Sequence, residues 1–216
     1  MNRLKGLIMA ALLLAATSAG ALEIAAGDGV TFMNPEPTND ISTGNWSLGW
    51  EFTPKVNTVA NLLGFYDAGH DGLSESHQVG LFDINGNLLR STTVTNADPY
   101  GMPTLDHPND GYWFKWREMD QGPIVLTAGE QYVLAAVTGT ELYTHGPADF
   151  TEHWATFIQA RYHDPAGSGL LDFPNVTEPG FTAYFGPNIG AAVPEPSTFA
   201  LLGLGAFALY RRRSGK

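Results

Sequence analysis

The sequence predicts an all-β fold: an antiparallel two-sheet sandwich of the jelly-roll kind, flanked by a targeting segment at each end. Short runs of alternating, β-branched and aromatic residues recur along the chain, and clusters of Gly, Pro, Asp and Asn separate them. No segment keeps a 3.6-residue apolar period long enough to require a helix. Short strands at fairly regular spacing favour a sandwich, and a barrel or a small α+β fold is the alternative.

The N-terminal targeting segment has the three parts of a secretory signal peptide. Arg3 and Lys5 form a positively charged region, Leu7–Ala16 is apolar, and the small residues Ala19 and Ala21 form a signal cleavage site. The apolar run is shorter than the roughly 17 residues that a relaxed membrane-spanning helix needs. We therefore expect signal peptidase to remove the first 21 residues during export, and a single-pass anchor is the alternative.

The predicted strands of the body include one hairpin. Asn85-Gly86 favours a two-residue turn, and the apolar runs on either side of it, Gln78–Phe82 and Leu88–Val94, are expected to pair. The other predicted strands are Trp50–Phe52, Val56–Tyr66, Tyr112–Trp116, Ile124–Leu126, Gln131–Val137, Trp154–Tyr162 and Phe181–Phe185.

The C-terminal targeting segment, residues 193–216, combines a proline motif, a short apolar run and a basic cluster. The motif is Pro194-Glu195-Pro196, and the apolar run ends at Tyr210. The basic cluster consists of Arg211, Arg212 and Arg213. Positive charge of this kind stops membrane transfer and stays on the cytoplasmic side. The apolar run therefore predicts a short transmembrane helix. Because the run has fewer residues than a relaxed membrane-spanning helix needs, we expect this helix to stay in the bilayer only temporarily.

This combination of residues resembles the PEP-CTERM sorting signal of Gram-negative bacteria. The resemblance implies that an exosortase, a membrane-embedded cysteine transpeptidase, recognises the Pro-Glu-Pro motif and removes the tail. It also implies export across the inner membrane, transient insertion into that membrane, and a final location at the cell surface or outside the cell. A plain C-terminal anchor with a proline-rich spacer is the alternative.

One predicted domain, residues 22–192, lies between the targeting segments. It keeps 5 of the 11 basic residues and 21 of the 22 acidic residues, so its formal net charge is −16. This charge keeps an exported protein soluble and argues against nucleic acid or anionic lipid as a direct partner. The chain has no cysteine, which excludes disulfides, thiol catalysis and cysteine-based zinc sites.

Two segments of the body resemble a secreted domain of unknown function that often accompanies PEP-CTERM tails. The first segment contains Trp50–Phe52, Leu62–Asp67, His77–Asp83 and Gly86–Leu89, and the second is Pro123–Leu134. Together they extend from about Ser47 to Gly139. The resemblance implies a β-sandwich fold and no catalytic activity.

An acidic, glycine-rich loop, residues 67–72, is the candidate metal site. Calcium takes roughly six to eight oxygen ligands, and carboxylates from this loop and its neighbouring strands could supply several. The predicted ligands are Asp67, Asp71, Glu75 and Asp83, with His70 and His77 nearby. A bound ion would stabilise a fold without cysteine, but the same residue types are common in exposed hairpin loops, which is the alternative interpretation.

Two further groups of residues bear on catalysis and ligand binding. His145, His153 and His163 fall near acidic residues, but their spacing matches no metalloprotease helix, and the chain has no Gly-x-Ser-x-Gly motif. Strand alternation separates Trp113 from its three aromatic neighbours, so Trp113 is the ring predicted to be exposed and to bind a sugar. The segment Asp98–Asp110 is a long, irregular loop of the kind that often carries function.

These observations predict an exported, exosortase-processed protein of the cell surface or extracellular matrix, without catalytic activity. The first alternative is a carbohydrate-binding module of the exopolysaccharide matrix that uses calcium. The second alternative is a secreted hydrolase, which rests only on the export route and the supply of acidic residues and histidines. The expected partners are signal peptidase, the exosortase and, for the first alternative, exopolysaccharide.

Overall fold

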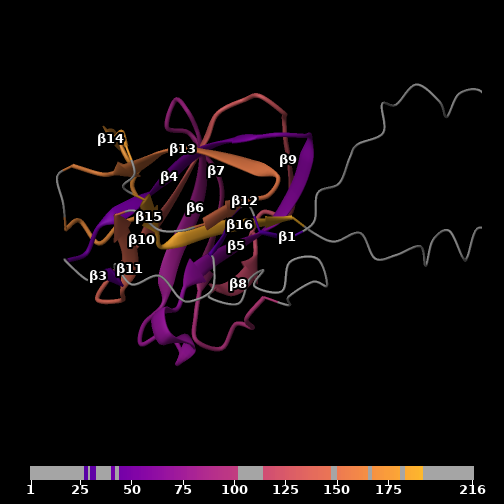
Figure 1. The fold of residues 1–216 in the computed structure, drawn as a ribbon. Coiled ribbons are helices and arrows are strands. Elements are labelled where there is room, and N and C mark those ends of the chain that lie inside the picture. The colour runs from indigo at the N-terminus through magenta and orange to yellow at the C-terminus, as the bar shows by residue number, and fades with distance from the viewer. Residues whose placement is uncertain are drawn as a thin grey trace, which may run out of the picture.

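The computed structural model describes residues 27–28, 30–32, 40–41, 44–101, 114–146, 150–164, 167–180 and 183–191. Within these ranges the protein is all-β, with two large antiparallel sheets and one short 3-10 turn, η1 (Ala68–His70) (Figure 1). The predicted all-β class is therefore confirmed. The predicted signal peptide and C-terminal helix lie outside the described residues, and no helix within them is long and apolar enough to cross a membrane.

A six-stranded sheet contains the predicted hairpin. Its strands, in spatial order, are β14 (Val176–Glu178), β13 (Ala155–Tyr162), β4 (Ser47–Pro54), β10 (Tyr132–Val137), β6 (His77–Asp83) and β7 (Leu88–Val94). β6 and β7 pair in antiparallel register on either side of Asn85 and Gly86, and Gly86 has a φ of 89°. Glycine adopts this left-handed conformation without steric cost, so the dipeptide that predicts the turn also forms it.

The second large sheet has five strands. Four of them lie in the order β1 (Gly27–Asp28), β16 (Pro187–Ala191), β5 (Thr58–Tyr66) and β8 (Phe114–Glu118), and β9 (Ile124–Leu126) also pairs with β5. Strand β16 is absent from the sequence-based prediction, because Pro187 and Gly190 are residue types that disfavour the interior of a strand.

Two smaller sheets complete the described fold. One consists of β15 (Ala183–Phe185), β11 (Tyr143–Gly146) and β3 (Asp40–Ile41), and the other of β12 (Phe150–Glu152) and β2 (Val30–Phe32).

The core lies between the two large sheets. Trp50 of β4 is fully buried, and its indole Nε1 donates a 2.8 Å hydrogen bond to the backbone oxygen of Pro187 in β16. His77 of β6 stacks on Phe65 of β5, with the two ring centroids 3.7 Å apart. These contacts join the six-stranded sheet to the five-stranded sheet. Other fully buried side chains of the core include Phe52, Leu63, Leu81, Leu126, Leu134 and Phe185.

Over β10 and the adjoining part of β6, the outer face of the six-stranded sheet is also buried, because residues 167–175 pass over it as a strap. Along β10, Leu134 belongs to the core, whereas Val133 belongs to a separate cluster that packs against the strap. In this cluster Phe173 of the strap lies edge-on to Phe82 of β6, with ring centroids 5.7 Å apart. Burial on both faces explains why β10 is a continuous apolar run rather than an alternating one.

A buried ion pair lies beneath the strap. Nη2 of Arg161 in β13 is 2.7 Å from Oε2 of Glu51 in β4, and Gln159 donates to the same oxygen at 2.8 Å. The guanidinium also donates a 3.2 Å hydrogen bond to the backbone oxygen of Pro174. The pair therefore connects two strands of the sheet to the strap.

Replacing Arg161 by alanine is expected to lower the free energy of unfolding by about 3–5 kcal/mol, because the buried Glu51 carboxylate would lose its partner. Only 3% of the Glu51 side chain is exposed. Urea denaturation measures the loss. The matched control is Lys55→Ala, which breaks the ion pair with Glu152 on the surface and should cost under about 1 kcal/mol. Equal losses in the two variants would contradict a structural role for the buried pair.

Candidate functional site

The acidic loop and the start of the segment 98–110 meet at one end of the sandwich. Asp67 follows β5 directly and is almost fully buried. The Tyr100 hydroxyl donates a 2.5 Å hydrogen bond to Oδ2 of Asp67, and the backbone N–H of Gly72 lies 3.0 and 3.2 Å from its two carboxylate oxygens. The carboxylate therefore fastens the turn of its own loop and joins that loop to Tyr100.

The ring of Tyr100 lies between two side chains. His70 stacks on it with ring centroids 3.6 Å apart, and Nζ of Lys115 lies 3.8 Å from the ring centroid. Two groups at these distances cannot share one face of the ring, so they occupy opposite faces. Burial, reinforced by the hydrogen bond to Asp67, raises the pKa of Tyr100 far above its usual value of 10.0. The hydroxyl therefore remains a donor at any physiological pH.

A salt bridge completes the group, which we call the Tyr100 cluster. Nη1 of Arg117 lies 3.2 Å from Oδ1 of Asp98, and Nζ of Lys115 donates to the backbone oxygen of Asp98 at 3.2 Å. The cluster consists of Asp67, His70, Asp98, Tyr100, Lys115 and Arg117. Two of the five basic residues of the body thus lie here, where they hold the start of the segment 98–110 on β8.

The four predicted calcium ligands do not share one site in the structure. Glu75 accepts hydrogen bonds from the backbone N–H and, at 2.7 Å, the hydroxyl of Thr140. Asp83 lies at the opposite end of β6, about 20 Å along the strand, where Asn87 donates to it through its backbone and its side chain. These bonds, the side-chain bond first, lower the pKa of Asp83.

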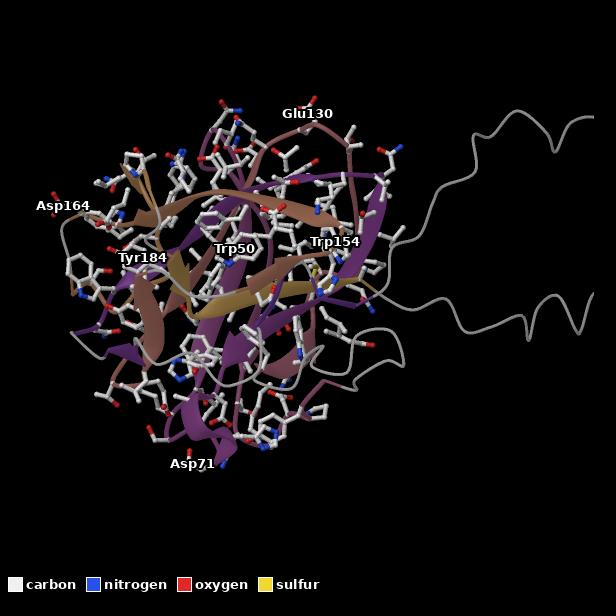
Figure 2. The ribbon with its side chains drawn as sticks, viewed as in Figure 1. Trp50, Asp71, Glu130, Trp154, Asp164 and Tyr184 are labelled. Atoms are coloured by element: carbon white, nitrogen blue, oxygen red, sulfur yellow. The ribbon has the colours of Figure 1, made fainter. Side chains whose placement is uncertain are left out.

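The remaining predicted ligand, Asp71, lies at one end of the sandwich (Figure 2). Glu130, an acidic residue outside the predicted set, lies at the other end. Among the described residues no group of three or more His, Asp or Glu side chains is placed to hold a metal ion. Asp67, Glu75 and Asp83 instead each accept hydrogen bonds from neighbouring loop residues.

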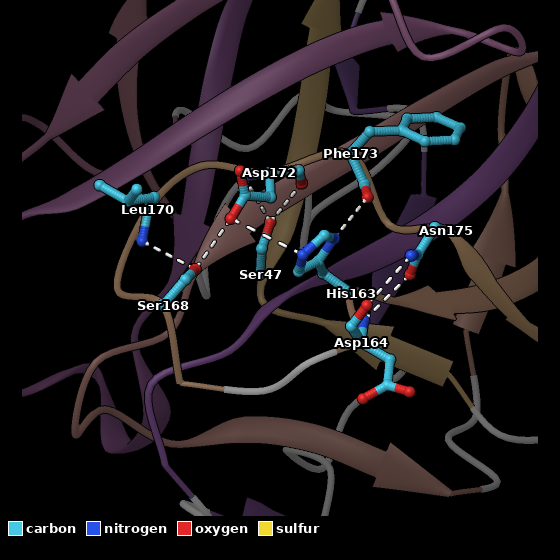
Figure 3. A network of polar contacts seen from close by, with 8 residues as sticks. All are labelled: Ser47, His163, Asp164, Ser168, Leu170, Asp172, Phe173 and Asn175. Atoms are coloured by element: carbon cyan, nitrogen blue, oxygen red, sulfur yellow. Dashed lines mark hydrogen bonds and ion pairs between the residues drawn. The ribbon is translucent and has the colours of Figure 1, made fainter.

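His163 and Ser47 fasten the strap to the six-stranded sheet. His163 Nδ1 lies 3.0 Å from the backbone oxygen of Phe173, and Nε2 lies 3.8 Å from Oδ2 of Asp172 (Figure 3). The hydroxyl of Ser47 donates to the backbone oxygen of Asp172 at 2.6 Å, so it is not directed at the imidazole. Although a serine, a histidine and an aspartate come together here, their hydrogen bonds differ from those of a nucleophile, base and orienting acid.

Of the other two histidines of this group, His145 belongs to β11 and His153 follows β12 directly. Glu152, next to His153, accepts a 2.9 Å hydrogen bond from the backbone N–H of Phe157 and pairs with Lys55. The side chain of His145 lies outside the described residues. The described contacts of these acidic groups therefore hold strands and turns in place.

Most of the described tryptophans belong to the interior. Trp50, Trp116 and Trp154 are buried, so their rings are not available to stack on a sugar. Trp113, the predicted sugar-binding residue, lies outside the described residues. So do the sorting motif, the arginine cluster and the signal cleavage site.

His77 is a buried group that sequence reasoning did not single out as structural. Its Nδ1 lies 2.9 Å from the backbone oxygen of Val137, and its Nε2 is buried without a hydrogen-bond partner. The neighbouring loops exchange hydrogen bonds, since Glu75 accepts from Thr140 and Glu141 accepts from the backbone N–H of Ser74. Burial lowers the pKa of His77 below 6.5, against the opposing effects of the Val137 oxygen and the two glutamates.

The free energy of unfolding is expected to fall as the pH drops below 6.5. The folded protein favours the neutral imidazole of His77, whereas the unfolded chain binds a proton from about pH 6.5 downward. The free energy of unfolding is therefore highest above pH 6.5, and it falls as the pH drops from 6.5 to the lower pKa of His77 in the folded protein. Urea denaturation between pH 7.5 and 5.5 should show a smaller pH slope for His77→Phe. The control is Val79→Ala, which removes buried apolar atoms from the same strand but no titratable group, and it should keep the slope. A slope unchanged by His77→Phe would contradict this assignment.

Two family models match the chain. The model of the family described as a domain of unknown function (DUF4082) matches residues 33–175, more than half of the chain. The PEP-CTERM protein-sorting motif matches residues 192–214, which confirms the predicted sorting signal and implies export, processing by an exosortase, and membrane or cell-surface association. No curated protein and no solved structure matches the chain. The chain therefore belongs to the DUF4082 domain family and carries a PEP-CTERM sorting motif after its domain.

Proposed function

We propose that this protein is delivered by a signal peptide, residues 1–21, processed by an exosortase, and acts without catalysis at the cell surface or in the extracellular matrix. The observation that carries the proposal is the position of the sorting motif. Strand β16 ends at Ala191, and the match to the motif begins at residue 192. The motif is thus attached directly to the folded body, which makes that body the cargo of the sorting route.

The hydrogen bonds of the acidic side chains support a non-catalytic role. Asp67 and Glu75 bind backbone N–H groups of loops, and Glu51 binds Arg161 beneath the strap. A general acid or base has to reach a substrate, whereas these groups are occupied by partners within the protein. Their evident contribution is to rigidify a body that has no disulfides.

Charge limits the kind of surface partner. The body carries a formal net charge of −16, so an anionic polysaccharide would be repelled unless divalent cations intervene. Because Trp50, Trp116 and Trp154 are buried and offer no stacking face, the carbohydrate-binding alternative rests on Trp113 and the half-buried Trp46. We therefore rank it below a structural or adhesive role.

Deleting residues 193–216 should change the location of the protein because it removes the sorting motif, and replacing Pro194 and Pro196 by alanine should leave the tail attached. Cell fractionation and the intact mass of the recovered protein measure both effects. The matched control keeps the tail length but replaces Pro194 and Pro196 by alanine, which removes the recognition element without shortening the apolar run. The proposal fails if the natural protein keeps its tail and is found in the same cell fraction as both variants.

A further inference from the structure

We propose that the end of strand β16 has to leave its sheet before the exosortase can process the tail, so that processing depends on local opening of the fold. The inference rests on the proposed sorting route and adds a structural requirement to it. It follows from the place of β16 in the sheet, from the weakness of its last pairings, and from the short chain between it and the Pro-Glu-Pro motif.

The beginning of β16 is firmly held. Its residues pair with β5 in regular register from Pro187 onward, and all five residues of the strand are buried. The oxygen of Pro187 accepts the hydrogen bond from the Trp50 indole across the core, and the Ile189 side chain is fully buried. Releasing these residues would expose the core, so this part of the strand is expected to open only when the whole domain unfolds.

The end of β16 is held less firmly. Its register with β5 is regular from Pro187 to Gly190 and then shifts, so that Ala191 lies opposite Ala60. On its other side, Gly190 and Ala191 pair with β1, a strand of only two residues. Of these two residues only Ala191 contributes a side chain to the core, and that side chain is a single methyl group. These last two residues can therefore detach at a lower free energy than the rest of the strand.

The recognition motif follows too closely for the folded strand to stay in place. Only Ala192 and Val193 separate Ala191 from Pro194, a reach of about 10 Å to the first proline when fully extended. A protein that binds an extended peptide as an added strand forms hydrogen bonds with the peptide backbone. Because Pro194 and Pro196 have no backbone N–H, the motif itself offers only the N–H of Glu195, and neighbouring residues, including those before the motif, have to supply further hydrogen bonds.

Those preceding residues include the end of β16. The backbone groups of Gly190 and Ala191 face β1 and β5 in the folded sheet, and the same groups cannot also pair with an enzyme. The two folded sheets would also collide with an enzyme bound at the Pro-Glu-Pro motif, because only two residues separate the motif from β16. A short opening at the end of β16 removes both obstacles and leaves the core closed.

A reversible cross-link tests this requirement in the full chain, exported in cells that carry the exosortase. Gly27 and Ala191 are opposite each other in the β1–β16 register, so Gly27→Cys with Ala191→Cys can lock the end of β16 to β1. The control pair is Gln78→Cys with Thr93→Cys, which are opposite each other in the β6–β7 hairpin. The natural chain has no cysteine, so each variant can form a single disulfide.

The rate of tail removal, followed by the mass of the protein over time, is the measurement. Locking β16 should slow removal about tenfold or more, and a reductant should restore it, whereas the control pair should have no effect. Inserting six Gly and Ser residues between Ala191 and Ala192 should speed removal and should rescue the locked variant, which shows that the locked protein is folded and exported.

The inference is overturned if the locked variant loses its tail at the rate of the natural chain, or if the insertion neither speeds removal nor rescues the locked variant. A different outcome would refute the sorting route itself. If the tail of the natural chain is never removed in cells that carry the exosortase, both the proposed function and the inference fail. If the natural chain is processed and only the locking has no effect, the function stands and the inference fails.

Discussion

The fold depends on a strand that lies almost at the end of the described chain. β16 separates β1 from β5, and its Pro187 receives the hydrogen bond by which Trp50 connects the two large sheets. Without β16, β5 would pair only with β8 and β9, so the five-stranded sheet is incomplete until β16 has joined it. During export, the body can therefore complete its core only after nearly all of it has crossed, while the sorting tail follows immediately behind.

This order places the two ends of the sandwich in different surroundings. Ala191 pairs with Ala60 near the start of β5, whereas Asp67 and the Tyr100 cluster follow the far end of the same strand, roughly 23 Å away. Processing therefore takes place at one end of the body, and the loops fastened by Tyr100 lie at the other. An exported protein held at its tail would present those loops outward, which agrees with a role in contacts at the cell surface.

The sequence predicts local features of the structure better than features that depend on two distant segments. Asn85-Gly86 predicts its hairpin because the turn needs only those residues, whereas β16 could not be predicted because its strand forms through burial between β1 and β5 despite Pro187 and Gly190. The acidic residues are near one another in sequence, but the length of β6 separates Asp83 from Glu75. His77 becomes buried only because Phe65, on the other sheet, stacks on it.

Amide hydrogen exchange along β16 and β5 tests the central claim most directly, because it measures the free energy of local opening at each residue. If the end of β16 opens locally, the amides of Gly190 and Ala191 exchange much faster than those of Leu63 and Phe65 in β5, through an opening that leaves the core folded. If the amides at the end of β16 were protected as strongly as those of Leu63 and Phe65, the end of the strand could open only with the whole domain. That result would contradict local opening at the end of β16.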